Sequence, residues 1–182
     1  MHDWAVIDAL VPIVLSHIQG CVVEIGLGNS TLILNKYAKQ FGRKHYACDA
    51  KLRVCSWVTN NIDSKELVIR NCKSFAFIKD FNDTPAIVFL DGNHSYATVK
   101  QETDFFLDKL AYGGMMFLHD TYLCKRWYDR YKAKGKESDT YKIRQDLEKN
   151  ASVYTMTFPY TAAYCGLTIA LKKDANREYY QV

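Results

Sequence analysis

Residues 22–31, VVEIGLGNST, decide the fold of this chain. The stretch begins with apolar residues, which predict a strand buried in a sheet. An acidic residue, Glu24, stands two positions before a Gly-x-Gly turn formed by Gly26 and Gly28. Glycine permits positive φ angles and lets a backbone approach a ligand closely. The stretch therefore predicts a strand that ends in a turn for a nucleotide-type ligand.

A helix is expected directly after this turn. Ser30 or Asn29 is suited to cap it, because short polar side chains accept hydrogen bonds from the first backbone amides of a helix. Gly42 is placed to end the helix. One helix face is apolar and is predicted to pack against the sheet; it consists of Leu32, Ile33, Tyr37, Ala38 and Phe41.

The composition fits one globular domain. The chain has 182 residues, of which 48% are hydrophobic, and this is enough for a full core. We expect a single domain over 1–182 that begins with a helical segment at 1–20. A net charge of +4 does not by itself indicate a nucleic-acid binder.

Two features predict a cytoplasmic protein. The N-terminal segment is interrupted by Asp3, Asp8 and Pro12 and has no preceding basic region, so neither a signal peptide nor a membrane span is expected. The cysteines are scattered without a C-x-x-C pair, as is typical of reduced, buried thiols. They are Cys21, Cys48, Cys55, Cys72, Cys124 and Cys165.

Strands and helices alternate along the rest of the chain. Five β-α units and two late strands predict an α/β fold, a Rossmann-like three-layer αβα sandwich. Its sheet would have seven mostly parallel strands and a terminal antiparallel pair. The apolar run 86–90, AIVFL, is expected to be the central strand. The other strands are expected at 22–25, 45–48, 66–72, 115–118, 153–158 and 167–171, and the later helices at 51–62, 95–110 and 140–150.

Polar residues directly follow four of these strands. They lie at 26–30, at 49, at 91–94 and at 119–120. Parallel α/β sheets bind ligands outside the carboxyl ends of their strands, so these residues are predicted to line one site. Asp49 follows the glycine turn by roughly 20 residues, the offset at which an acid binds ribose in dinucleotide-binding folds. The alternative for Asp49 is a capping role at the start of the next helix.

Residues 88–121 carry a more specific pattern, VFLDGNHSYATVKQETDFFLDKLAYGGMMFLHDT. Its D-G-x-H-x-Y turn, helix, Gly-Gly and terminal H-D resemble the central signature of class I S-adenosylmethionine (SAM)-dependent methyltransferases. The resemblance is to a family that includes O-methyltransferases of small molecules and relatives of the cephalosporin hydroxylases. It covers 21–121. The third glycine of the NAD fingerprint is replaced by Thr31.

The resemblance implies a site for each part of SAM. It places the methionine end of the cofactor at five residues of the first turn, namely Glu24, Gly26, Gly28, Asn29 and Ser30. It places the ribose at Asp49 and the sulfonium beside Asp91. It places the adenine ring at three residues after the third strand, Cys72, Lys73 and Ser74.

The resemblance also implies a catalytic cluster. In several metal-dependent members, one acid after the fourth strand and an acidic pair after the fifth hold a divalent ion, and a histidine three positions after the first acid is a proposed base. Those positions hold Asp91, His119 with Asp120, and His94. His119 departs from the pattern, and a histidine ligand would favour Mn²⁺, Fe²⁺ or Zn²⁺ over Mg²⁺. The alternatives are helix capping by His94 and a hydrogen bond from His119 to Asp120.

The acceptor is expected to be an oxygen nucleophile. The turn after the fourth strand reads D-G-N-H, whereas amino methylation of adenine typically uses N-P-P-Y or D-P-P-Y, and no proline precedes a cysteine as in pyrimidine carbon methylation. We therefore predict a small-molecule or glycan hydroxyl and disfavour nucleic acid. Two alternatives stay open, an NAD- or nucleotide-sugar-dependent oxidoreductase and a binding module without turnover.

Two further segments are predicted to adjoin the site. The segment 122–141 is basic and aromatic and is expected to border the acceptor pocket, with a solvated helix and loop as the alternative. It contains Lys125, Arg126, Arg130, Lys132, Lys134 and Lys136 with Trp127, Tyr128 and Tyr131. Near the N-terminus, an apolar set is expected in the core, with a cover over the cofactor as the alternative. This set is Trp4, Ile7, Leu10, Val11, Val14 and Ile18.

Overall fold

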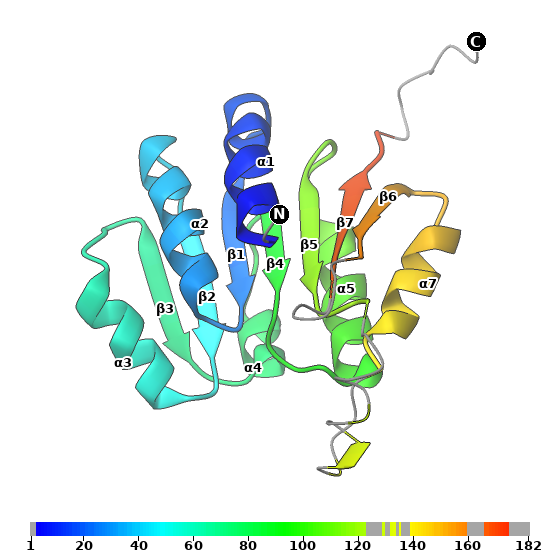
Figure 1. Ribbon diagram of the computed structural model, residues 1–182. Coiled ribbons are helices and arrows are strands. Elements are labelled where there is room, and N and C mark those ends of the chain that lie inside the picture. The colour runs from blue at the N-terminus through cyan, green and yellow to red at the C-terminus, as the bar shows by residue number, and fades with distance from the viewer. Residues whose placement is uncertain are drawn as a thin grey trace.

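The computed structural model describes residues 3–122, 129, 132–133, 135, 139–159 and 166–174. These residues form a sheet of seven strands in the order β3-β2-β1-β4-β5-β7-β6, with helices on both faces (Figure 1). The strands are β1 (Cys21–Ile25), β2 (His45–Asp49), β3 (Leu67–Asn71), β4 (Pro85–Leu90), β5 (Met115–His119), β6 (Val153–Phe158) and β7 (Leu167–Lys172). The helices are α1 (Asp3–His17), α2 (Asn29–Gln40), α3 (Leu52–Asn61), α4 (Ser74–Lys79), α5 (Tyr96–Lys109) and α7 (Tyr141–Lys149).

The predicted three-layer αβα sandwich is confirmed, including its terminal strand pair. Strands β1 to β5 are mutually parallel, and β7 lies antiparallel between β5 and β6. From β1 the chain adds β2 and β3 on one side and then crosses to add β4 on the other. The strand order therefore reverses between β1 and β4, where ligands of such sheets bind.

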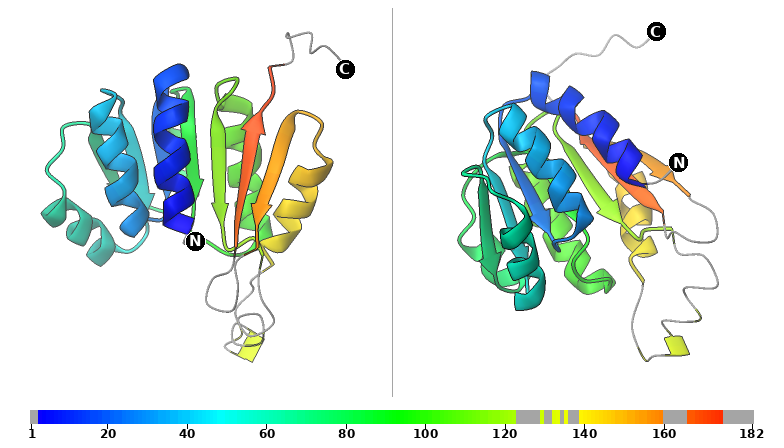
Figure 2. Two further views of the ribbon diagram at one scale, coloured as in Figure 1. Left: turned by 45° about the horizontal axis from the view of Figure 1, so that its top comes forward. Right: turned by 60° about the vertical axis from the view of Figure 1, so that its left-hand side comes forward.

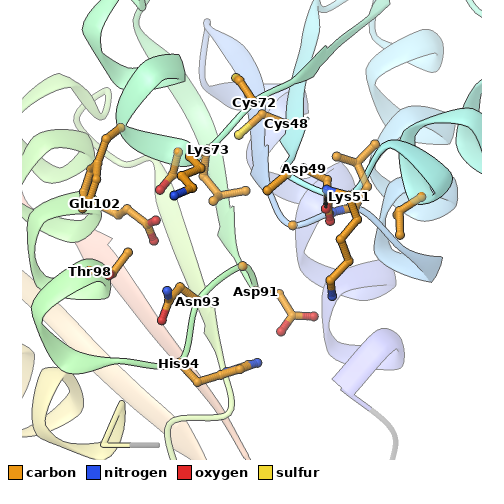
Figure 3. A pocket seen from close by; sticks show the side chains of 18 of the residues that line it. Cys48, Asp49, Lys51, Cys72, Lys73, Asp91, Asn93, His94, Thr98 and Glu102 are labelled. Atoms are coloured by element: carbon orange, nitrogen blue, oxygen red, sulfur yellow. Dashed lines mark hydrogen bonds between the residues drawn. The ribbon is translucent and has the colours of Figure 1, made fainter. Parts of the chain in front are cut away.

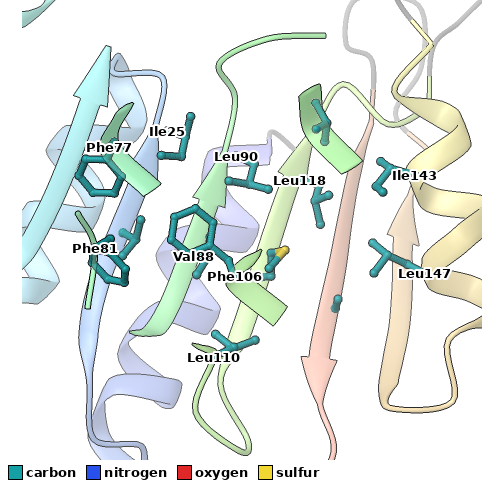
Figure 4. Close-up of a cluster of buried hydrophobic side chains, with 14 of the residues drawn as sticks. Ile25, Phe77, Phe81, Val88, Leu90, Phe106, Leu110, Leu118, Ile143 and Leu147 are labelled. Atoms are coloured by element: carbon teal, nitrogen blue, oxygen red, sulfur yellow. The ribbon is translucent and has the colours of Figure 1, made fainter. Parts of the chain in front are cut away.

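Two apolar cores hold the layers together. One joins α4, α5 and α7 to one sheet face and includes Phe77, Val88 and Phe106, all at most 2% exposed (Figure 4). The other joins α1 and α2 to the opposite face through side chains such as Ile87 and Phe117. Strand β4 is buried along its whole length because it contributes to both cores, as its continuous apolar run predicts.

Helix α1 runs unbroken through Pro12, although this proline was expected to interrupt the segment. Proline has no backbone amide, so the carbonyl four residues earlier, that of Asp8, loses its helical partner. The hydroxyl of Tyr37 on α2 donates a hydrogen bond to this carbonyl at 3.0 Å. The neighbouring helix thus offers this carbonyl a donor in place of the missing amide, although the same hydroxyl also lies 2.8 Å from the Asp8 carboxylate. The apolar side of α1 lies in the core as predicted, with Ile7 and Val11 fully buried.

Three local expectations need correction. Helix α2 is capped by Gly28, and Asn29 is its first residue, so neither Asn29 nor Ser30 is the cap. Gly28 has an extended φ of 178°, which any residue adopts, whereas Gly26 has a φ of 91°. The short helix α4 was not predicted, because its six residues are fewer than a periodic pattern needs.

None of the described helices is both long enough and apolar enough to cross a membrane. Most of the basic and aromatic segment predicted at 122–141, including Lys125, Arg126 and Trp127, lies outside the described residues. So do Cys124 and Cys165. The cysteines at 21, 48 and 55 are buried in the described part of the chain, as expected, whereas Cys72 is only half-buried because it lies at the wall of a cavity.

Candidate active site

A cavity of about 980 Å³ opens at the carboxyl ends of β1, β2 and β4, where the strand order reverses. It lies where the polar residues after the strands were predicted to meet. Figure 3 shows the labelled side chains around it. The predicted residues that line it are Gly26, Asp49, Cys72, Lys73, Ser74, Asp91 and His94.

The glycine turn fits tightly against the loop after β4. A β-carbon added at Gly26 would collide with the backbone of Asp91 and Gly92. The amide of Asp91 also donates to the carbonyl of Ile25 at 2.8 Å. Gly26 is thus required mainly because two loops pack together, and this contact forms one wall of the cavity.

Glu24 lies beneath the turn and not in the wall of the cavity. Its side chain is fully buried, accepts a hydrogen bond from the Ser30 hydroxyl and lies 3.4 Å from the His45 ring. Ser30 is buried by this contact, and Asn29 is exposed on α2. The structure therefore places Glu24 and Ser30 where they stabilise the turn, and brings Gly26 and Leu27 to the cavity.

Asp49 ends β2 with its carboxylate fixed by the backbone. One carboxylate oxygen accepts a hydrogen bond from the Leu27 amide at 3.2 Å, and the other accepts one from the Lys51 amide at 2.6 Å. Each oxygen retains acceptor capacity, since a carboxylate has about four lone-pair sites. The carboxylate joins the glycine turn to the start of α3 and remains at the cavity wall, where it can accept further hydrogen bonds.

Two acid and histidine pairs lie at the ends of β4 and β5. The Nδ1 atom of His119 is 3.2 Å from the Asp91 carboxylate and 3.3 Å from that of Asp120. The Nδ1 atom of His94 is 3.4 Å from the other oxygen of Asp120. The two pairs follow neighbouring parallel strands, and Leu90 near the end of β4 is paired with Leu118 near the end of β5. All four predicted residues are therefore brought into one cluster.

The backbone and α1 position this cluster. Asp120 has a φ of 58°, in the left-handed region that few residues other than glycine adopt. Backbone conformations of this kind are often found at functional sites. The Trp4 ring on α1 stacks on the His119 ring with centroids 5.7 Å apart and an 8° interplanar angle. Figure 2 shows α1 beginning near the carboxyl edge of the sheet. Trp4 thus packs against the site as well as the core.

The start of α5 does not depend on a histidine cap. The backbone amide of Ser95 is bound by the Asn93 side chain at 2.8 Å, and that of Tyr96 by the Asp139 carboxylate at 2.6 Å. The side chain of His94 instead faces Asp120. This geometry favours a role for His94 in the site over the alternative of helix capping.

The sequence-based prediction missed several cavity residues, among them Leu27, Lys51 and Glu102, and Glu102 on α5 is the most unusual of them. It is 1% exposed, and burial raises the pKa of its carboxyl from 4.5 to about 7, an effect that the nearby Ser74 side chain partly offsets. Its sequence signal was its position on the inward face of the helix, three residues after Val99 and four before Phe106. An acid on such a face is a candidate for a buried function.

The sheet order, the glycine turn and the cavity at the switch point define the fold of class I SAM-dependent methyltransferases. By sequence, residues 23–121 match a family described as a methyltransferase domain. This match spans more than half of the chain, and the chain therefore belongs to that family of methyltransferases. The oxidoreductase alternative is thereby excluded. No curated protein matches the sequence.

Similar solved structures have the same fold. The O-methyltransferase from Bacillus cereus in complex with S-adenosylhomocysteine (SAH) is 14% identical, with 95% of this chain and 82% of that chain covered and a TM-score of 0.73. The O-methyltransferase TomG from Streptomyces achromogenes, in complex with SAM, is 12% identical, with 93% and 78% covered and a TM-score of 0.71. The SAH-bound methyltransferase PaMTH1 from Podospora anserina is 14% identical, with 84% and 71% covered and a TM-score of 0.66.

Proposed function

We propose that this protein transfers the methyl group of SAM to a hydroxyl of a small molecule or glycan, within a single domain over 1–182. The observation that carries the proposal is the cluster of Asp91, His94, His119 and Asp120, of which Asp91 and His94 line the cavity. The similar structures from Bacillus cereus and Streptomyces achromogenes hold SAH and SAM, which supports the same cofactor for this cavity. The buried cysteines support a cytoplasmic location.

The cavity walls support one orientation of SAM. The methionine end would lie against Gly26 and Leu27, whose backbone is fixed by the loop after β4. The ribose hydroxyls would donate to the carboxylate of Asp49, which the Leu27 and Lys51 amides already orient. The sulfonium would then face Asp91, which begins the loop that carries the catalytic cluster.

Methyl transfer is an in-line displacement, so the acceptor oxygen must be aligned with the methyl group and must lose its proton. His94 is the proposed base. Its Nδ1 atom faces Asp120 at 3.4 Å, so Asp120 would orient the ring and stabilise the imidazolium, and Nε2 would accept the proton. Residues of 122–141 are proposed to border the acceptor.

The cluster also fits a divalent cation. Ligand atoms of Asp91, His94 and Asp120 all lie within 4.8 Å of one another. A set of two carboxylates and one imidazole suits Mn²⁺, Fe²⁺ or Zn²⁺ better than Mg²⁺, and His119 beside both acids could serve as a further ligand. A bound ion would lower the pKa of the acceptor hydroxyl. In that case His94 would be a ligand, and another group would take the proton.

The test is to measure methyl transfer and cofactor binding in parallel. Purified protein is supplied with SAM and a panel of catechols, phenols and hydroxylated sugars, with Mn²⁺ or with chelator, and SAH release is followed. Loss of a general base typically costs about 10²–10⁴ in rate. His94→Ala should therefore lower turnover at least about a hundredfold and leave the SAH dissociation constant unchanged.

A matched control is His17→Ala, because His17 is exposed on α1 outside the cluster. This control should behave as wild type. If His94→Ala retains full turnover, the base assignment is wrong. If His94→Ala abolishes Mn²⁺ binding measured by electron paramagnetic resonance, His94 is a metal ligand. Intact SAH binding without methyl transfer to any acceptor would favour a binding module.

A further inference from the structure

Glu102 is a buried carboxyl group that faces the cofactor cavity. It lies on the same side of α5 as Ser95 and Thr98, at helical spacings of four and seven residues, and all three line the cavity (Figure 3). The side chain is 1% exposed. Neither carboxyl oxygen has a hydrogen-bond partner within 3.5 Å among the described residues, although the Ser74 side chain lies close enough to lower the pKa of the group slightly. A buried polar group without a close partner is costly, so this position is suited to a ligand that provides one where the described residues do not.

Glu102 forms no ion pair with any residue that the structure describes, although Lys73 lines the same cavity. In the described part of the chain, no side-chain nitrogen of a lysine, arginine or histidine lies within 4.0 Å of a carboxyl oxygen of Glu102. On the elements packed against α5, β4 contributes no titratable side chain and α4 contributes the exposed Lys79. On α7, Lys142 and Asp146 contact Tyr96, and Arg144 pairs with Glu148. The titratable groups that line the same cavity are Cys48, Asp49, Lys51, Cys72, Lys73, Asp91 and His94.

The position of Glu102 in the cavity indicates which part of the cofactor it meets. The next step rests on the proposed binding of SAM. With the methionine end at Gly26 and the ribose at Asp49, the remaining part of the cavity lies between the start of α4 and α5. That part is lined by Ser74, Phe75 and Glu102 and is left for the adenine ring.

We propose that Glu102 binds in its protonated form to the N1 and N6 edge of the adenine ring and thereby selects for it. A neutral carboxyl group has one O–H donor and one carbonyl acceptor. Adenine presents the complementary pair, an acceptor at N1 and a donor at the N6 amine. Two hydrogen bonds can therefore form side by side, from the carboxyl O–H to N1 and from the N6 amine to the carbonyl.

The ionised carboxylate matches this edge less well. It has only acceptors, so it can accept from N6 but its second oxygen would face the lone pair of N1. Burial already favours the neutral form, since it raises the pKa of Glu102 to about 7. Cofactor affinity should therefore fall as pH rises above this value, because a proton must be taken up for the two-bond arrangement to form.

The test is calorimetric titration of the full-length protein with SAH between pH 6.5 and 8.5. The wild-type dissociation constant should rise by about tenfold over this range. Glu102→Gln presents a donor and an acceptor without titrating, so it should bind SAH as tightly at pH 8.5 as at pH 6.5. Glu102→Leu should bind weakly at every pH. Glu148→Gln, an exposed position on α7, is the matched control and should follow wild type.

A second ligand shows whether the contact is to the adenine edge. An SAH analogue with hydrogen in place of the 6-amino group should bind at least about tenfold more weakly than SAH to wild type and to Glu102→Gln. Glu102→Leu should not distinguish the two ligands. This coupling is a readout that a purely structural role of Glu102 would not produce, and thermal unfolding of each variant confirms that it is folded.

The outcomes separate this inference from the proposed function. If wild type binds SAH and Asp49→Ala binds it more weakly, the cofactor assignment stands. If Glu102→Leu then binds SAH as tightly as wild type and still distinguishes the two ligands, the proposed role of Glu102 is refuted. An equal pH dependence in wild type and Glu102→Gln would also refute it. If wild type does not bind SAH at all, the proposed function fails and the inference fails with it.

Discussion

Replacing Asp49 with alanine tests the placement of the cofactor directly. Hydrogen bonds to a charged group contribute about 1.5–3 kcal/mol each, so two ribose hydroxyls on this carboxylate would contribute about 3 kcal/mol at the lower end of the range. Asp49 is only partly buried, and water recovers some of the loss in the variant. We therefore expect a loss of about 2 kcal/mol, or an SAH dissociation constant about 30-fold higher.

The assay is calorimetric titration with SAH for wild type, Asp49→Ala and Asp49→Asn. Asparagine keeps one oxygen acceptor for a backbone amide or a hydroxyl and should give an intermediate affinity. Asp104→Ala is the matched control, because this carboxylate is exposed on α5 and pairs with Lys100 on the same helix. Thermal unfolding identifies any variant that has lost its fold.

A folded Asp49→Ala protein that binds SAH within twofold of wild type would refute the placement of the ribose at the end of β2. The carboxylate would then serve only to connect the Leu27 and Lys51 amides. An equal loss of affinity in Asp104→Ala would also contradict the argument, because it would show that the effect comes from charge and not from position.

Three further predictions concern stability. Phe106→Ala should lower the free energy of unfolding, measured with guanidinium, by about 3–5 kcal/mol because Phe106 is fully buried. The control Ile13→Ala, at a side chain that is 56% exposed, should change it by no more than about 0.5 kcal/mol, and equal losses would contradict the assignment of the core. Gly26→Ala should destabilise the protein by more than about 1 kcal/mol, because Gly26 has a φ of 91° and an added β-carbon would collide with the loop after β4. Gly28→Ala should be tolerated, because nothing lies within 4 Å of an added β-carbon, and a greater loss of stability in Gly28→Ala than in Gly26→Ala would overturn this account of the turn. Burial raises the pKa of Glu102 from 4.5 to about 7, so between pH 4.5 and pH 7 the folded protein keeps a proton that the unfolded chain has released. The free energy of unfolding should therefore fall by about 3 kcal/mol as pH rises through this range, and this contribution should stay level above it. Glu102→Gln should lack this part of the pH dependence, and identical slopes in the two proteins would show that the carboxyl does not titrate there.

The sequence predicted the sheet well because burial leaves a direct pattern in it. Strand β4 is buried on both faces, and its unbroken apolar run is visible without any structure. The late strand pair is visible for a related reason, since β6 lies at the edge and alternates between buried and exposed side chains such as Val153 and Tyr154. Both signals depend only on which side of a strand meets the core.

The site could be predicted as a group of residues but not as a set of contacts. The carboxyl ends of parallel strands meet at one edge, so Asp91, His94, His119 and Asp120 were expected together. Which nitrogen meets which carboxylate depends on the register of β4 and β5 and on the left-handed backbone of Asp120. No local pattern in the sequence encodes either feature, because both arise from packing between distant segments.

At the switch point, backbone hydrogen bonds connect the proposed cofactor-binding and catalytic residues. The amide of Gly26 donates to the carbonyl of Cys48 at 2.8 Å, and the amide of Asp91 donates to that of Ile25 at 2.8 Å. These bonds hold the ends of β1, β2 and β4 in one rigid junction. Asp49 at the end of β2, the proposed ribose ligand, and Asp91 at the end of β4, in the proposed catalytic cluster, are therefore held at a fixed separation. Because in-line transfer tolerates little misalignment, this junction is what would hold the sulfonium and the base in register with the acceptor.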